Sequence, residues 1–153
     1  MRVVIAAVGR MRPGPPRALL ETYLGRMTSL SVEVREVAPR GNLPAHKLKA
    51  EEARLLLQAL PESGPIIAMD ERGDDLTSQA FTAMLADWRG QGQPACGFAI
   101  GGADGLDDSI RQRAARTLRF GRATWPHMMV RAMLAEQLYR SQQILAGHPY
   151  HRE

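Results

Sequence analysis

The fold of this protein is decided by residues 95–105, which read ACGFAIGGADG. Residues 95–100 are continuously apolar, and we expect a strand over 96–100 that is covered on both faces. The next five residues contain three glycines, which allow a backbone to turn tightly or to approach a ligand closely. Ligands of open α/β sheets bind at the carboxyl ends of strands. The stretch therefore predicts a buried strand followed by a candidate binding loop, and a purely structural turn fits the glycines equally well.

Strand and helix patterns alternate on both sides of this stretch. Short apolar runs predict buried strands at 3–8 and 66–69, and alternation predicts a half-exposed outer strand at 31–37. A last strand is expected at 117–120. Apolar residues at helical spacing predict helices around 19–27, 45–60 and 81–88, one capped by Asp107 or Asp108, and one from about 127 to 145. The pattern predicts one α/β domain over residues 1–153, with a mostly parallel sheet flanked by helices.

Composition narrows the function classes. The chain has 153 residues, 44% of them hydrophobic, and a formal net charge of +4, which favours an anionic partner only mildly and is equally compatible with solubility. The single cysteine, Cys96, lies in the apolar run and excludes an internal disulfide, as is typical of a cytoplasmic protein. The run Val3–Val8 is too short to span a membrane and lacks the pattern of a cleaved signal peptide. We expect a cytoplasmic protein without a membrane association.

Polar side chains follow the strand predicted at 66–69. Asp70 ends that strand, and Arg72, Gly73, Asp74 and Asp75 come next. A carboxylate at a strand end can accept a hydrogen bond from a ribose hydroxyl. A solvated turn is the more ordinary interpretation of Asp74 and Asp75, because such clusters are typical of loops.

The last predicted helix is apolar on more than one face. Its large apolar residues are Met128, Met129, Val130, Met133, Leu134, Leu138, Tyr139, Ile144 and Leu145. Such a helix is buried on several sides, either as the central helix of the core or against a second copy of the chain. Glu136 and Arg140, four residues apart, are expected to pair on its surface.

The chain ends in residues 147–153, which read GHPYHRE. His148 and His151 are separated by Pro149 and have no third ligand nearby, so we expect no metal site. Tyr150, His151 and Arg152 place a stacking ring, a proton carrier and a phosphate binder in a row. A frayed terminus is the usual interpretation of such a tail.

Four motifs, taken in order, resemble one known family. They are IGGADG at 100–105, TWPHMMVR at 124–131, EQLYR at 136–140 and HPYHRE at 148–153. Together they resemble the pseudouridine methyltransferases of large-subunit ribosomal RNA, which are members of the SPOUT class. The likeness covers nearly the whole chain and is looser in the N-terminal half. It implies a trefoil-knotted α/β fold, a homodimer, and transfer of a methyl group from S-adenosylmethionine to N3 of a pseudouridine in the 23S RNA of assembled ribosomes.

The resemblance also implies roles for particular residues. The loops that hold S-adenosylmethionine correspond to Met69, Gly101, Phe120, Gly121, Arg122, Ala123, Thr124 and Trp125. Gly121 stands where the family usually has serine, and Ala123 stands where it has a larger apolar residue. Backbone N–H and C=O groups can recognise the cofactor in spite of both differences.

The proposed chemistry needs a base, because an imide nitrogen attacks a methyl group well only after it loses its proton. Histidine titrates near neutral pH, so His151 is our first candidate and Glu136 the second, while His127 is expected to be structural. Three arginines are expected to position phosphates or to favour the anionic form of the pseudouridine base: Arg131, Arg140 and Arg152. Tyr150 is expected to stack on that exposed base. No metal is required.

Three other functions are compatible with parts of the sequence. A knotted methyltransferase that acts on transfer RNA would keep the cofactor and change the substrate. A ribosome-binding factor without catalysis would keep only the RNA contacts, which the intact tail argues against. A different nucleotide-binding α/β enzyme is disfavoured, because such folds usually place their glycine loop after the first strand.

Overall fold

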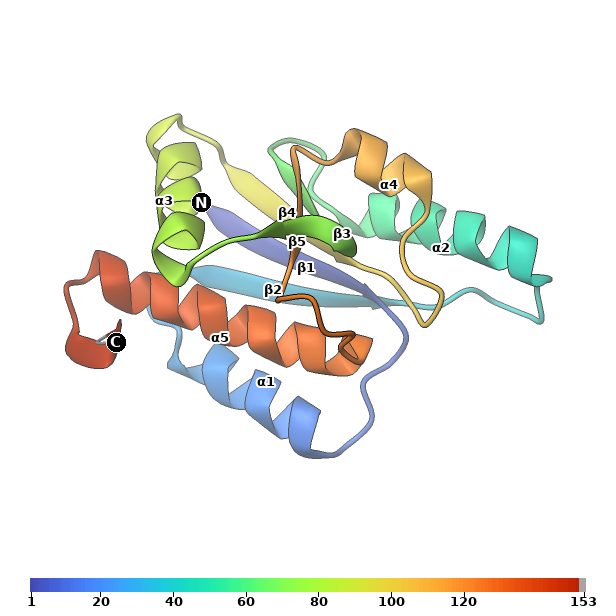
Figure 1. Ribbon diagram of the computed structural model, residues 1–153, viewed down its shortest axis with the longest axis horizontal. Coiled ribbons are helices and arrows are strands. Elements are labelled where there is room, and N and C mark those ends of the chain that lie inside the picture. Colours follow the sequence, from blue (N-terminus) through green and yellow to red (C-terminus); the bar gives the residue numbers. More distant parts are fainter. Residues whose placement is uncertain (152–153) are drawn as a thin grey trace.

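The computed structural model describes residues 1–151, except for the side chain of His151. Five strands form one all-parallel sheet in the order β2-β1-β4-β3-β5 (Figure 1). The strands are β1 Arg2–Val8, β2 Ser31–Val37, β3 Ile66–Asp75, β4 Ala95–Ile100 and β5 Arg116–Arg119. The helices are α1 Pro15–Arg26, α2 Ala45–Ala59, α3 Ser78–Gly90, α4 Asp108–Arg113 and α5 His127–Leu145, followed by the 3-10 turn η1 Pro149–His151. The predicted parallel α/β class is confirmed.

Helices cover both faces of the sheet, because β1 and β4 are apolar on both faces. Alternate residues of β1, such as Val3 and Ile5, join a core that α3 and α5 complete. Ala6 and Val8 point to the opposite core, under α2 and α4. Figure 1 shows α1, α3 and α5 on one side of the sheet and α2 with α4 on the other. The strand predicted at 31–37 is β2, which lies at the sheet edge and alternates in exposure as expected.

β3 is longer than its apolar run, which corrects the turn expected at Asp74 and Asp75. The strand continues to Asp75 after a register shift between Met69 and Asp74, and its last residues pair with β5. Gly73 makes this possible, since a side-chain carbon there would lie 2.5 Å from the backbone nitrogen of Leu118. The two backbones approach too closely for any larger residue.

The last helix is the central helix of one layer. α5 packs against α1 and α3, and Leu134 and Leu138 on it are fully buried. It begins directly after Pro126, as predicted, and α4 begins at the expected cap, where the Asp107 side chain accepts a hydrogen bond from the Ser109 N–H. None of the helices within residues 1–151 has the length and the apolar character needed to cross a bilayer.

Candidate functional site

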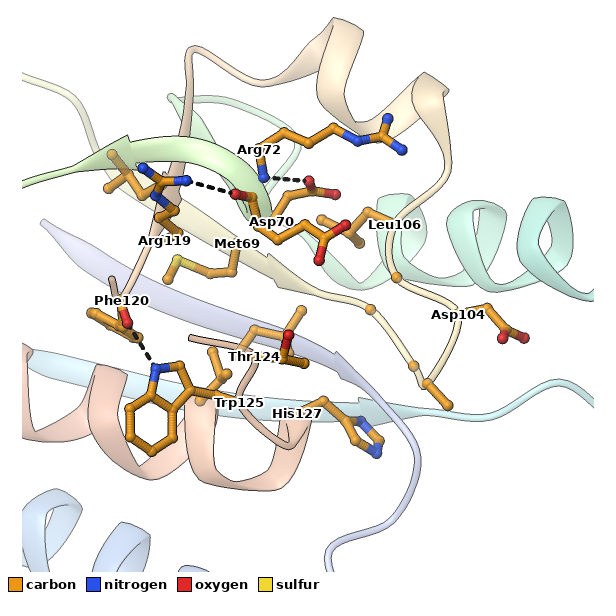
Figure 2. Close-up of a pocket in the computed structure, with 18 of the residues that line it drawn as sticks. Met69, Asp70, Arg72, Asp104, Leu106, Arg119, Phe120, Thr124, Trp125 and His127 are labelled. Carbon is orange, nitrogen blue, oxygen red and sulfur yellow. Dashed lines mark hydrogen bonds between the residues drawn. The ribbon is translucent and has the colours of Figure 1, made fainter. Parts of the chain in front are cut away.

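A pocket of about 300 Å³ opens where β3, β4 and β5 end. Its walls are residues 69–72 within β3, the glycine loop 101–105, and residues 118–121 and 123–125, which run from the end of β5 into the segment after it (Figure 2). The volume lies at the lower end of the range for small-molecule sites. The three predicted cofactor segments, separate in the sequence, therefore line one cavity at the carboxyl edge of the sheet. Arg122 is the one residue of the predicted set that is not among the residues lining it.

The glycine loop is a tight turn, which confirms the structural interpretation of its glycines. It also lines the pocket, and ligand binding by the loop stays a prediction. The Gly105 N–H donates to the Gly102 carbonyl at 3.1 Å, and Gly105 has a positive φ of 76°. A side-chain carbon on Gly101 would lie 2.7 Å from the Gly105 carbonyl carbon. Gly101 is therefore required by the close approach of the loop to itself, and the main chain is left to face the cavity.

The segment after β5 forms the opposite wall and is held by its own side chains. The Trp125 indole N–H donates to the Phe120 carbonyl at 2.8 Å, while the Trp125 side chain stays 43% exposed at the mouth. Gly121 has a positive φ of 79°, which glycine adopts without strain. Its N–H donates to Asp75 at 3.1 Å, and Asp75 also pairs with Arg119. The glycine found in place of the family's serine thus fits the backbone conformation at this position.

A buried ion pair supports the base of the pocket. Asp70, whose side chain is 6% exposed, accepts from the Arg111 guanidinium at 2.8 Å and from the Arg72 N–H at 3.0 Å. Arg111 also donates to the Leu106 carbonyl at 2.7 Å. Asp70 thereby fastens β3 to the glycine loop and α4, with its oxygens already engaged. The sequence analysis missed Arg111, although a carboxylate at the end of a buried strand requires a cationic partner.

His127 lines the pocket at the start of α5, and the buried Arg131 follows it on the same helix. The His127 ring packs against Gly9, and its pKa is lowered from the usual value, first by burial and then by the charge of Arg131. Arg131 is fully buried; it donates to the Val8 carbonyl and to Glu36 at 3.0 Å. This burial corrects the expectation that Arg131 contacts RNA phosphates: the guanidinium instead joins α5 to the ends of β1 and β2.

A second cluster of predicted residues lies farther along α5. Arg140 donates to Glu136 at 2.7 Å, which confirms the expected pair and raises the pKa of Arg140. The Tyr150 ring packs edge-on against Tyr139, with centroids 4.9 Å apart, and Arg140 lies 5.1 Å from its centroid. The Tyr150 hydroxyl lies 3.4 Å from Glu136. We name Glu136, Tyr139, Arg140 and Tyr150 the tail cluster.

The tail cluster shows that the chain end packs back on α5 as far as Tyr150, so a fully frayed tail is the wrong interpretation. Burial, and then a hydrogen bond with Tyr23, raise the pKa of Tyr150 to about 12, so its hydroxyl stays protonated at neutral pH. The His151 side chain and Arg152, both predicted to be catalytic, lie outside the described residues.

The pocket and the tail cluster do not meet within one chain. Val130 lines the pocket, whereas Glu136 follows six residues later, about 9 Å along the helix axis. None of the four residues of the tail cluster lines the pocket. The structure thus divides the predicted site residues into a cofactor group and a catalytic group.

The described residues offer neither a metal site nor a reactive cysteine. Within residues 1–151, no three His, Cys, Asp or Glu side chains come together as a metal-binding group. Cys96 is buried, and desolvation raises the pKa of its thiol to about 12. A thiol with that pKa is neutral and inert at physiological pH.

Comparison with known proteins finds methyltransferases, both among family models and among individual relatives. The family model described as "Predicted SPOUT methyltransferase" matches residues 1–151. A ribosomal RNA large subunit methyltransferase H from Rhodospirillum centenum is 53% identical over 152 residues, and one from Paramagnetospirillum magneticum is 50% identical over 152 residues. Each alignment covers 99% of this chain and 99% of the relative.

Solved structures share the fold at much lower identity. A probable methyltransferase from Bordetella pertussis superposes with a TM-score of 0.58 at 15% identity, covering 92% of this chain and 95% of the other. A probable methylase family protein from Haemophilus influenzae gives a TM-score of 0.60 at 9% identity, covering 99% of this chain and 70% of the other. At these identities the likeness supports the arrangement of strands and helices alone.

Proposed function

This chain belongs to the SPOUT methyltransferase family, and from that membership we propose that it methylates N3 of a pseudouridine in large-subunit ribosomal RNA. S-adenosylmethionine is the methyl donor. The relatives at 53% and 50% identity are named for the large-subunit RNA, which favours ribosomal over transfer RNA as the substrate. We further propose a trefoil knot in this fold, a cytoplasmic location, where ribosomes are, and no requirement for a metal.

The observation that carries the proposal is the pocket itself. Its three walls are the three segments that the family resemblance assigns to the cofactor, brought together at one sheet edge. Apolar side chains of Ile100, Leu118 and Val130 would contact the adenine ring of the cofactor. The main chain of the glycine loop would form hydrogen bonds with the polar edge of that ring. The carboxylates of Glu71 and Asp104 also line the pocket and suit a cationic ligand.

When bound, S-adenosylmethionine supplies an electrophilic methyl group on its positively charged sulfur. The chain must then hold the pseudouridine and take the proton from its N3. We assign the removal of that proton to His151, because histidine is the side chain type best suited to proton transfer at neutral pH, with Glu136 as the alternative. Arg140 and Tyr150 would contact the RNA, and Arg152 would favour the anionic form of the pseudouridine base. His127, kept neutral by its surroundings, adds no positive charge beside the sulfonium.

A homodimer would resolve the separation of the two groups of residues. Met129, Met133, Glu136 and Arg140 follow one another by three or four residues, so they form one stripe along α5. Met129 and Met133 are half-exposed and belong to none of the buried core clusters. If this stripe packs against a second copy, the tail cluster of one protomer can face the pocket of its partner.

The test is direct. Purified protein, labelled S-adenosylmethionine and ribosomes from cells lacking this protein should yield one methylated pseudouridine in the large-subunit RNA, located by mass mapping of nucleosides. Total transfer RNA is the parallel substrate. Methylation of transfer RNA alone would reassign the substrate, and RNA association without any methyl transfer would favour a non-catalytic ribosome-binding factor.

A further inference from the structure

Two short segments of this protein carry positive charge and no carboxylate. The whole chain has 20 Lys and Arg against 16 Asp and Glu. Residues 9–14 and 38–50 contain no Asp or Glu and five of those cations: Arg10, Arg12, Arg40, Lys47 and Lys49. The rest of the chain, with 15 cations against 16 carboxylates, is therefore close to neutral. Residues 109–135 form a third stretch without carboxylates and contain six arginines, but Arg111, Arg119 and Arg131 among them are paired with Asp or Glu from elsewhere in the chain.

The sheet brings the two segments together beside the cofactor pocket. β1 and β2 pair in parallel with Val8 opposite Val37, and the Gly9 N–H donates to the Val37 carbonyl at 2.8 Å. The chain therefore leaves both strands at the same edge of the sheet (Figure 1). Since β4 is the other neighbour of β1, the glycine loop that ends β4 lies at this same edge. We name the five cations the basic edge.

The basic edge is available to an external anion. Arg10, Arg12, Arg40 and Lys47 are exposed, and none of them forms an ion pair with another described residue. Arg17 and Arg54, by contrast, are exposed arginines whose charge is already paired, with Glu21 and Glu51 respectively, both at 2.7 Å. Lys49 is half-buried and lines the cofactor pocket, so the basic edge reaches the rim of the pocket.

A groove of about 800 Å³ runs along this surface between the end of β2 and α2. Arg40, Lys47 and His46 line it together with apolar side chains such as Leu43 and Leu55. Among the residues lining it, the one carboxylate is Glu51, which is neutralised by Arg54 at 2.7 Å. Cations beside an apolar surface match a nucleic acid strand, whose phosphates bind Lys and Arg and whose sugars and bases tolerate apolar contact.

We propose that the basic edge binds the phosphate backbone of the ribosomal RNA that flanks the methylated pseudouridine. The inference rests on the proposed function, because an RNA strand that reaches the pocket must cross an adjoining surface. The basic edge then supplies affinity, and the pocket and tail cluster supply chemistry. Phosphate contacts of this kind position a substrate without reading its sequence.

The experiment compares two charge-neutralising triple variants of the full chain. The first, Arg12→Gln with Arg40→Gln and Lys47→Gln, removes cations of the basic edge and spares the pocket. The control, Arg2→Gln with Arg26→Gln and Arg89→Gln, removes three exposed arginines at the opposite edge, near the starts of β1, β2 and β4. Both variants change the net charge equally. Thermal melting and calorimetry with S-adenosylmethionine verify that fold and cofactor affinity are kept in both.

Ribosome affinity should fall about 10- to 100-fold at 0.1 M salt for the first variant and stay near wild type for the control. The slope of log affinity against log salt should become shallower by about 2 to 3, since each lost phosphate contact removes about 0.7 to 0.9. The methylation rate at saturating ribosomes should be unchanged. The proposal that the basic edge binds RNA would be overturned if ribosome affinity fell equally in the two variants, or if the first variant kept wild-type affinity. A wild-type protein that binds ribosomes without methylating them would instead refute the proposed function, and the two binding curves would still test the basic edge.

Discussion

Removing residues 150–153 should separate catalysis from folding. The truncation deletes Tyr150 and with it an edge-on contact with Tyr139, a cation–π contact with Arg140 and a weak hydrogen bond to Glu136. Aromatic pairs contribute about 0.5–1.5 kcal/mol, and exposed cation–π contacts about 0.5–1 kcal/mol. We therefore expect the free energy of unfolding to fall by only about 1–2 kcal/mol. No cavity forms, because Tyr150 packs on the outer surface of α5.

Catalysis should respond far more strongly. If His151 is the base, its loss should slow methyl transfer about 100- to 10,000-fold. Cofactor affinity should hardly change, because Tyr150 is not among the residues that line the pocket. Urea denaturation measures the first effect, single-turnover methylation of ribosomes the second, and calorimetry with S-adenosylmethionine the third.

Point variants locate the effect within the tail. His151→Ala should reproduce the loss of rate without the loss of stability, whereas Tyr150→Phe keeps the ring contacts and serves as the matched control for packing. A truncated protein that methylates ribosomes at nearly the wild-type rate would refute the assignment of the base to His151. Glu136 would then become the candidate, and Glu136→Gln the variant to examine.

Three further changes test other parts of the structure. Gly101→Val should abolish measurable cofactor binding by calorimetry, because its side chain would displace the turn of the glycine loop; wild-type affinity would show that the loop does not hold the cofactor. Glu36→Gln should destabilise the protein by about 1–3 kcal/mol in urea, since it removes the counter-charge of the buried Arg131 while solvent reaches the Glu36 side chain, which is 32% exposed; a change below about 0.5 kcal/mol would contradict that role. Met133→Glu should convert a dimer into a folded monomer in light scattering, with circular dichroism to confirm folding; a monomeric wild type at micromolar concentration would exclude the dimer.

The sequence alone predicted the elements of this fold and the segments that line the pocket. Apolar runs and helical spacing depend on neighbours a few residues away, so they identified five strands, five helices and a cap at Asp107 or Asp108, of which the structure uses Asp107. The glycine loop was recognisable for the same reason, because a tight turn at the end of a buried strand has a local signature. Motif order then indicated that Met69, Gly101 and residues 120–125 belong to one site, and the structure places nearly all of them around one pocket.

Only the tertiary structure decided which charged residues are buried and which face outward. Arg131 is the last residue of the motif at 124–131 and was expected to contact RNA, yet Glu36 and the Val8 carbonyl, far away in sequence, hold it inside the protein. β3 continues past its apolar run because Gly73 lets β5 approach. The tail cluster forms because the Tyr150 ring packs against the Tyr139 ring on α5. Each outcome depends on a partner distant in the chain. A local pattern shows that a residue is charged or aromatic, but the fold alone supplies the partner that determines its role.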